Sequence, residues 1–293
     1  MDKPKTLVFI GAHPDDETFG MGGTFAHYAS RGYRTYYICA TRGEAGEADA
    51  KFRAGYATMG DLRWAELTAA AKTLGLTEVI YLGYRDSGML GSPDNQNPQA
   101  FINAPIDEVT GKMVKLLRQL KPEVVVTFDP IGGYRHPDHI AGHKAAVAAF
   151  YAAADPARYP QAGPCFHPAK LYFGVFPRHL MKLAVKVMPL FGKNPHQFGK
   201  NKDIDLTQMI EPEFPVHAAV KLTKEDLRIR DKATACHASQ LGDTSPRKGI
   251  FGLVFLLSAL FNGLMGQRDY YMRAYPEPKP KERREKDLFE GLK

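Results

Sequence analysis

Cysteine is scarce in this chain of 293 residues, which has only Cys39, Cys165 and Cys236. An odd number of widely spaced cysteines argues against a disulfide scaffold and against a zinc finger built from cysteine alone. A long apolar run is also missing from the first residues, where acidic side chains follow a short hydrophobic stretch, so we expect no secretion signal. We therefore expect a cytoplasmic protein that is held together by a hydrophobic core.

Acidic residues are absent from residues 178–202, although the whole chain has 32 Asp and Glu against 39 Lys and Arg. This segment contributes six of the seven excess positive charges. Because the rest of the chain is nearly balanced, the positive charge is a local feature, and we expect no nucleic-acid partner.

Apolar runs alternate with helical patterns over the first 175 residues. Runs rich in β-branched and aromatic residues predict strands at residues 6–11, 34–40, 78–82, 123–128 and 170–175. Helices are predicted between them at about 19–31 and at 61–74, 105–120 and 140–154, with Asp61 as an N-cap and Gly75 as a C-cap. This alternation predicts an α/β fold with a mostly parallel sheet, helices on both faces, and helical and strand additions at the C-terminal end.

One domain is expected over residues 1–275, with residues 177–210 and 249–266 as lids or peripheral insertions. The remaining residues, 276–293, are proline-led and charged, and we expect a surface arm or a disordered tail. Residues 83–103 are rich in Gly, Pro, Asn, Asp and Ser and predict a long loop, a feature that is often functional.

Histidines and acids follow the first and fourth predicted strands, where ligand sites form in open α/β sheets. A dinucleotide is a poor ligand for this edge, because acids directly after the first strand would repel a pyrophosphate. Imidazole and carboxylate groups suit a divalent cation, and three such ligands with an open position mark a catalytic zinc site. His13 and Asp16 lie three residues apart across a turn, and His139 could supply a third ligand. The alternative is an acid-rich helix N-terminus without a metal.

Several stretches of the sequence resemble the LmbE-like (PIG-L) N-deacetylase family. The runs AHPDDE at 12–17 and HPDH at 136–139 are similar to its paired motifs. Further similar stretches are TRGEAG at 41–46, RWAEL at 63–67, GYRDSGM at 83–89, as in the mycothiol-pathway branch, and CHASQ at 236–240. The resemblance covers residues 5–245, apart from 178–210. It implies a Rossmann-like fold and zinc-dependent hydrolysis of amides, usually on substrates that contain N-acetylglucosamine.

The resemblance also implies a role for each matching residue. It assigns three ligands to one zinc or other divalent ion, namely His13, Asp16 and His139. It assigns four residues to catalysis, namely Asp15 as the general base, His136 as a general acid or carbonyl-polarising group, Asp138 as an orienting acid beside it, and Tyr134 as a stabiliser of the oxyanion. It assigns three residues to substrate binding, namely Glu44, Arg63 and Asp86. The alternative interpretation of Arg63 and Glu66 is that both lie on the solvated face of a helix and have no role in the site.

We therefore expect hydrolysis of the N-acetyl amide of a small glucosamine-containing molecule, which yields a free amine and acetate. One alternative is an amidase that acts on a thiol conjugate, whose acyl part would contact the loop at 83–103. Another is a metal-dependent sugar-binding module without catalysis, which the presence of Asp15 disfavours. Either His136 or Asp15 could protonate the leaving amine, and the sequence does not decide between them.

Two segments outside the resemblance share a possible role at the mouth of the site. Basic residues recur every four positions at 178, 182 and 186, and residues 250–265 contain no charge in 16 residues, fewer than the roughly 20 needed to span a bilayer. The simpler interpretation is a lid, a buried helix or a contact in a homo-oligomer. The alternative is a basic, apolar surface that docks peripherally on an anionic membrane or binds a lipid-linked sugar.

Overall fold

The computed structural model describes residues 3–176, 182, 185–191, 194–197, 205–241 and 267–292. The basic helix predicted at 177–193 lies mostly outside these ranges, and the apolar segment 250–265 lies wholly outside them. A membrane-docking surface built from the two therefore stays a prediction. No helix within the described ranges is both long and apolar enough to cross a membrane.

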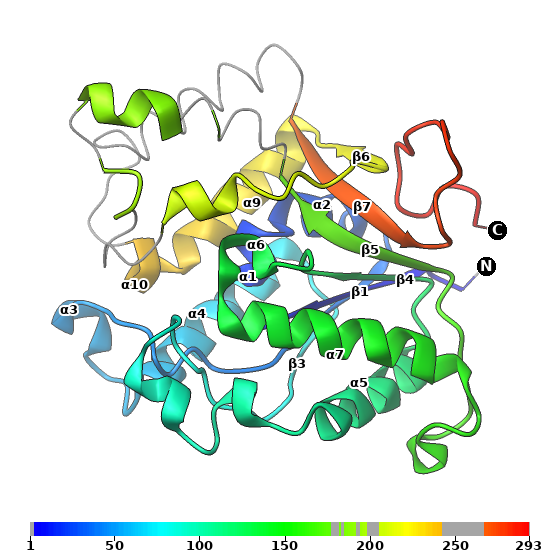
Figure 1. Cartoon of the computed structure of the whole chain (residues 1–293), viewed down its shortest axis with the longest axis horizontal. Coiled ribbons are helices and arrows are strands. Elements are labelled where there is room, and N and C mark those ends of the chain that lie inside the picture. Colours follow the sequence, from blue (N-terminus) through cyan, green and yellow to red (C-terminus); the bar gives the residue numbers. More distant parts are fainter. Residues whose placement is uncertain are drawn as a thin grey trace.

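A mixed sheet runs through the centre of the molecule (Figure 1). Within the described ranges its strands are β1 (Thr6–Gly11), β2 (Arg34–Cys39), β3 (Glu78–Tyr81), β4 (Val124–Thr127), β5 (Lys170–Val175), β6 (Ala218–Lys221) and β7 (Arg268–Tyr275). They lie in the order β3-β2-β1-β4-β5-β7-β6, and the first five in this order are parallel to one another. Strand β7 runs antiparallel to both β5 and β6. The predicted α/β fold is confirmed, and the strand order reverses between β1 and β4, where open α/β sheets bind ligands.

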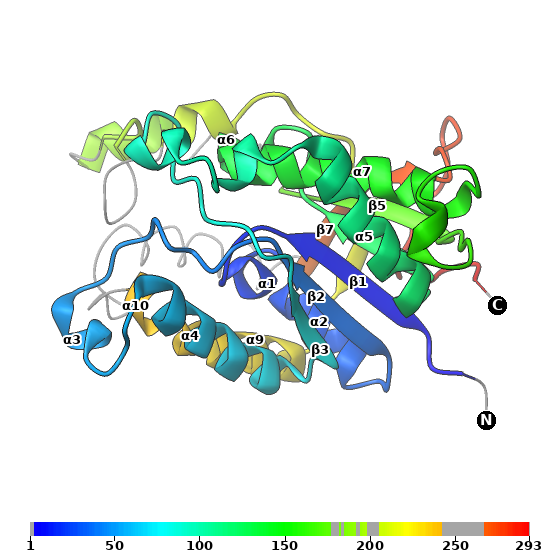
Figure 2. The same ribbon diagram turned by 90° about the horizontal axis from the view of Figure 1, so that it is seen from below.

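Helices cover both faces of the sheet, as Figure 2 shows. One face is covered by α5 (Ile106–Leu120) and α7 (Pro137–Ala154), and the other by α2 (Gly22–Ala29), α4 (Met59–Leu74) and α9 (Lys224–Cys236). Short helices complete the described elements, namely α1 (Asp16–Phe19), α3 (Ala50–Arg53), α6 (Gly132–Arg135) and α10 (Ala238–Leu241), with 3-10 turns η1 (Pro93–Gln96), η2 (Phe101–Asn103), η3 (Pro160–Ala162), η4 (Met188–Phe191) and η5 (Leu206–Met209). The turns η1 and η2 lie in the predicted loop at 83–103.

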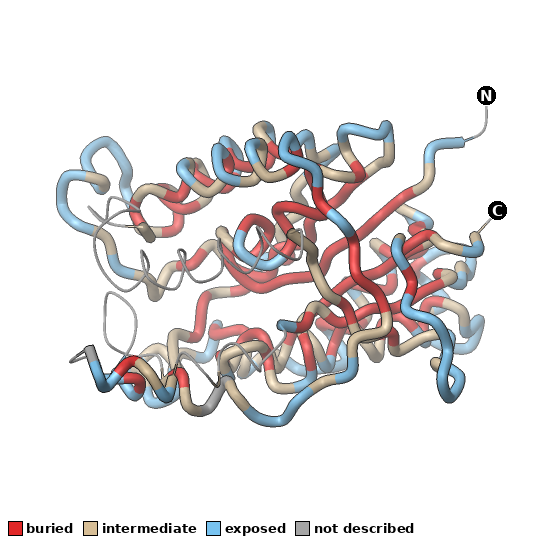
Figure 3. The backbone as a smooth tube through the Cα atoms, turned by 90° about the horizontal axis from the view of Figure 1, so that it is seen from above, coloured by how far each residue is buried: buried red, intermediate tan, exposed pale blue. Residues whose placement is uncertain are grey.

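Side chains of β1 alternate between two hydrophobic cores, one on each face of the sheet. Val8 and Ile10 pack with residues of α5 and α7, whereas Leu7 and Phe9 pack with residues of α2 and α4. The central strands are consequently buried along their length (Figure 3). A strand buried on both faces is a rigid support for the residues that follow it.

Two helices begin earlier than the sequence predicts, and both changes affect predicted metal ligands. Helix α7 begins at Pro137 rather than at residue 140, because proline suits the first helical position and Nδ1 of His136 accepts a hydrogen bond from the Asp138 amide at 3.2 Å. The single helix predicted at 19–31 is instead two helices, α1 and α2, which are separated at residues 20 and 21. Asp16 and His139 therefore lie in the first turn of a helix.

Helix α4 follows the prediction closely except at its N-terminus. It begins at Met59, with Thr58 as the N-cap, and Asp61 is the third helical residue of a capping box with Thr58. The predicted C-cap is confirmed, since Gly75 adopts the left-handed conformation with φ 76°.

The segment after residue 275, for which we expect a surface arm or a disordered tail, is docked on the core at its end, although residues 276–284 are exposed or half-buried. Leu288 is 0% exposed and Phe289 is 4% exposed, and both join the core on the α2 face. Glu285 is buried as well, where it accepts hydrogen bonds from Lys170 Nζ at 2.7 Å and from the Tyr172 hydroxyl at 2.5 Å. Two apolar side chains and one buried ion pair therefore dock a segment whose composition is mostly charged.

Leu288→Ala is expected to lower the free energy of unfolding by about 2–5 kcal/mol, because it leaves a cavity in a fully buried position. Urea unfolding would measure this loss. Glu277→Ala changes an exposed residue of the same segment and should stay within about 0.5 kcal/mol of the unsubstituted protein. Equal stability of the two variants would show that the tail does not dock.

Candidate active site

The first predicted cluster lies on the tight turn between β1 and α1. Oδ2 of Asp16 accepts hydrogen bonds from the backbone amides of Ala12 and His13 at 3.0 and 2.7 Å, which folds the turn around its carboxylate. Asp15 has φ 122°, in the region that favours glycine. Such strain persists only where surrounding contacts hold it, and it is common at functional sites.

The second predicted cluster lies in the first turn of α7, after β4. Because β1 and β4 are neighbours in the sheet, the two clusters meet at one edge. Nδ1 of His13 lies 3.2 Å from Nε2 of His139, and the latter nitrogen lies 3.3 Å from Oδ1 of Asp16. The structure thus brings the three predicted metal ligands together.

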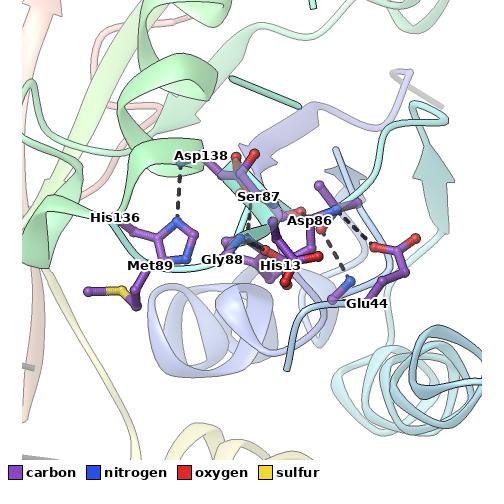
Figure 4. Close-up of polar contacts among 12 residues, drawn as sticks. His13, Glu44, Asp86, Ser87, Gly88, Met89, His136 and Asp138 are labelled. Carbon is purple, nitrogen blue, oxygen red and sulfur yellow. Dashed lines mark hydrogen bonds and ion pairs between the residues drawn. The ribbon is translucent and has the colours of Figure 1, made fainter. Parts of the chain in front are cut away.

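The outer nitrogens of both imidazoles face acceptors. Nδ1 of His139 lies 3.2 Å from the Gly132 carbonyl oxygen. Nε2 of His13 lies 3.1 Å from Oδ2 of Asp138, and both residues are labelled in Figure 4. We infer that these outer nitrogens carry the protons, since carbonyl and carboxylate oxygens only accept. In the neutral rings the two inner nitrogens, Nδ1 of His13 and Nε2 of His139, then have free lone pairs. These lone pairs lie close to each other and to the Asp16 carboxylate.

This convergence of acceptors fits a divalent cation. A tetrahedral zinc ion with bonds of about 2.0–2.1 Å places two nitrogen ligands about 3.3 Å apart, close to the spacing of the inner nitrogens. Hydrogen bonds from the outer nitrogens to oxygen are the usual support of metal-binding histidines. Burial opposes a positive charge on His13, yet Asp86 and Asp138 raise its pKa well above 6.5, so the surroundings favour a cation there.

His136 lies close enough to form a second possible ligand set with His13 and His139. Its Nδ1 accepts the Asp138 amide, however, so the proton of the neutral ring is on Nε2 and neither nitrogen has a free lone pair. Burial, together with His13 and His139, lowers the pKa of His136 well below 6.5. The ring is therefore a neutral hydrogen-bond donor, which suits the polarisation of a carbonyl.

Asp15 has the properties of a general base. Its side chain is 18% exposed, and Oδ2 accepts a hydrogen bond from Nη2 of Arg63 at 2.9 Å. Burial raises the pKa of Asp15 to about 6, although Arg63 opposes the shift. A general base is most effective when its pKa lies near the working pH.

Tyr134 and Asp138 lie beside these residues. The ring of Tyr134 is 5.1 Å from that of His139 between centroids, and burial raises its pKa well above 10, so the hydroxyl keeps its proton and can donate it to an oxyanion. The carboxylate of Asp138 contacts His13 and accepts the Ser87 amide at 3.0 Å. The hydrogen bond between Asp138 and the His136 ring comes from the Asp138 backbone amide. The Asp138 carboxylate is thus hydrogen-bonded to His13, and its backbone amide to His136.

The three predicted substrate-binding residues lie in different surroundings. Arg63 is 5% exposed and Glu66 is 9% exposed, so the interpretation of both as a solvated helix face is wrong. Oδ1 of Asp86 lies 3.4 Å from Nε2 of His13, beside the predicted metal ligands. Glu44 accepts the Asp86 amide at 3.0 Å and borders a cavity of about 460 Å³ that lies against the 83–103 loop. Among the three, only Glu44 lines this cavity.

Sequence reasoning missed a buried pair between Glu17 and His237. Oε1 of Glu17 lies 2.7 Å from Nε2 of His237, and neither side chain is exposed. Burial opposes a charge on His237, but Glu17 raises its pKa above 6.5. The signal in the sequence is weak, because Glu17 stands among other acids and His237 lies in a stretch that only resembles a family motif.

Comparisons with known proteins point to the same chemistry. The family model described as PIG-L, GlcNAc-PI de-N-acetylase, matches residues 8–150. A protein of Geodermatophilus obscurus described as 1D-myo-inositol 2-acetamido-2-deoxy-alpha-D-glucopyranoside deacetylase is 36% identical over 301 residues, which cover 100% of this chain and 99% of that protein. A Rhodococcus erythropolis protein with the same description is 35% identical over 98% of both chains. The N,N'-diacetylchitobiose deacetylase of Pyrococcus horikoshii shares the fold, with a TM-score of 0.64 and 19% identity over 92% of this chain and 84% of that one.

Proposed function

The chain belongs to the PIG-L (LmbE-like) family of de-N-acetylases and is a hydrolase of amide carbon–nitrogen bonds, and on this premise we propose its substrate and the roles of its residues. The proposed substrate is a small glycoside of N-acetylglucosamine, with an inositol glycoside as the first candidate. This choice rests on one observation. The full chain is 36% identical in sequence to a relative whose description names that compound.

The proposed metal ligands are His13, Asp16 and His139, and zinc suits this set of donors. When bound there, a divalent ion supplies Lewis-acid polarisation for the hydrolysis of an amide. The fit rests on the inner nitrogens and the Asp16 carboxylate, which converge as acceptors.

Residues of the chain supply proton transfer and charge stabilisation in this proposal. The Asp15 carboxylate accepts a proton from the attacking water as the new carbon–oxygen bond forms at the acetyl carbon. Nε2 of His136 and the Tyr134 hydroxyl donate hydrogen bonds to the developing oxyanion, an effect typically worth about 3 kcal/mol for each donor. The carbon–nitrogen bond then breaks, and Asp15 returns the proton to the leaving amine. The neutral state of His136 favours Asp15 over His136 for this last step.

The cavity beside Glu44 supports a polyhydroxylated substrate. Its lining offers carboxylates, side-chain amides and aromatic rings, from Glu44, Glu108, Gln99, Asn103, Tyr81 and Tyr84. Such groups suit the hydroxyls and apolar faces of a sugar or a polyol, and the volume of about 460 Å³ is within the usual range for small-molecule sites. We propose that this cavity receives the group to which the glucosamine is attached.

An amine-release assay with matched substrates tests the proposal. The inositol glycoside of N-acetylglucosamine should be hydrolysed with a kcat/KM at least about tenfold above that of free N-acetylglucosamine, because the attached group adds binding energy. A higher kcat/KM for the amide of a thiol conjugate would support the amidase alternative. Binding of the glycoside without any release of amine would support a sugar-binding module.

A further inference from the structure

Asp15 is held in its strained conformation from two sides. Its carboxylate accepts a hydrogen bond from Nη2 of Arg63, and its backbone amide donates to Oε2 of Glu17 at 2.9 Å. The second contact fixes the peptide at the residue with φ 122°. Glu17 is 0% exposed, so a substrate that enters from solvent does not reach its side chain.

Glu17 is itself fixed by a residue that is distant in the sequence. His237 follows α9, and its Nε2 lies 2.7 Å from Oε1 of Glu17 across a sequence separation of 220 residues. A buried carboxylate is costly unless it is paired, so His237 holds the Glu17 side chain in the position that meets the Asp15 amide.

The same segment also supports the other side of Asp15. The backbone amide and the hydroxyl of Ser239 donate to the Glu66 carboxylate at 2.8 and 2.7 Å. Glu66 lies on α4, one helical turn after Arg63, so Ser239 holds the helix from which Arg63 reaches Asp15. His237 therefore contacts Glu17 directly, whereas Ser239 supports Arg63 only through Glu66 on the same helix.

We propose that Glu17, His237 and Ser239 are positioning residues for Asp15. They act on the rate through the backbone and carboxylate of Asp15, and they bind neither substrate nor metal. This inference rests on the proposed function, in which the Asp15 carboxylate transfers the proton.

Glu17→Leu removes the acceptor for the Asp15 amide and replaces the carboxylate with an apolar side chain of similar size. It should lower kcat about 10- to 100-fold, as the loss of a supporting hydrogen bond does at other sites, and leave KM within about twofold. Metal content and circular dichroism should match those of the unsubstituted enzyme. Glu17→Gln is the matched control, because its amide oxygen can still accept from Asp15, and it should recover most of kcat.

A double-mutant cycle with Asp15→Ala separates positioning from general damage. If Glu17 acts through Asp15, adding Glu17→Leu to Asp15→Ala should change the residual rate by less than about twofold. A second loss as large as that in the single variant, or a loss of metal, would overturn the inference. Near-normal turnover of Asp15→Ala alone would instead overturn the proposed function.

A second pair of variants covers the case in which Glu17→Leu does not fold. In His237→Gln the side-chain amide nitrogen can occupy the position of the His237 Nε2 atom. In His237→Asn the side chain is too short to do so. We expect His237→Asn to lower kcat at least about tenfold relative to His237→Gln, with equal KM. Equal values of kcat in the two variants would contradict a positioning role.

Discussion

Asp15→Ala is expected to lower turnover by a factor of about 10² to 10⁴, the usual contribution of a general base, while the protein still binds one divalent ion per chain. The substitution removes the proton acceptor, but it leaves the three proposed ligand side chains in place. KM should change little, since the loss concerns an interaction of the transition state. Steady-state kinetics and elemental analysis of the same sample would measure both effects.

Asp15→Asn is the matched control for this substitution. Alanine removes the nearer of the two carboxylates beside the buried Arg63 guanidinium and leaves only Asp86 at 4.0 Å, which costs stability as well as activity. Asparagine keeps an oxygen that can accept from Arg63 but is not a base, so it should lose turnover with a smaller loss in thermal stability. Turnover near that of the unsubstituted enzyme in either variant would show that another group is the base.

His139→Ala is expected to lose both metal and activity, because it removes the nitrogen that meets His13 and Asp16. Metal content should fall well below one ion per chain. In the unsubstituted enzyme a chelator should abolish turnover, and added zinc should restore it. His143→Ala is the matched control one helical turn along α7, where the ring contacts the Phe128 carbonyl instead, and it should keep both metal and activity.

His136→Ala tests whether His136 is a metal ligand. We expect it to retain the metal and lose turnover, because Nδ1 of His136 accepts the Asp138 amide and its other nitrogen carries the proton. Loss of the metal in this variant would place His136 among the ligands. Retention of the metal in His139→Ala would show that the proposed ligand set is wrong.

The sequence alone predicted the first five strands and the chemistry of the two clusters that follow β1 and β4. These features are local, since a buried strand is a short apolar run and each cluster occupies a few consecutive residues. The two clusters were expected to meet because open α/β sheets bind ligands where their strands end. The resemblance of residues 12–17 and 136–139 to family motifs added the role of each residue.

Tertiary structure decided what depends on partners far apart in the chain. The tail docks because Leu288 finds a core built from distant helices and Glu285 finds Lys170, and no local pattern in a charged segment shows either partner. Arg63 is buried because Asp15 and the chain around it cover its guanidinium. Glu17 meets His237 only when α9 packs beside α1 and α2, across 220 residues. Local sequence determines which groups are present, whereas packing determines which of them meet, because the free energy of a buried polar contact depends on a partner that folding alone brings near.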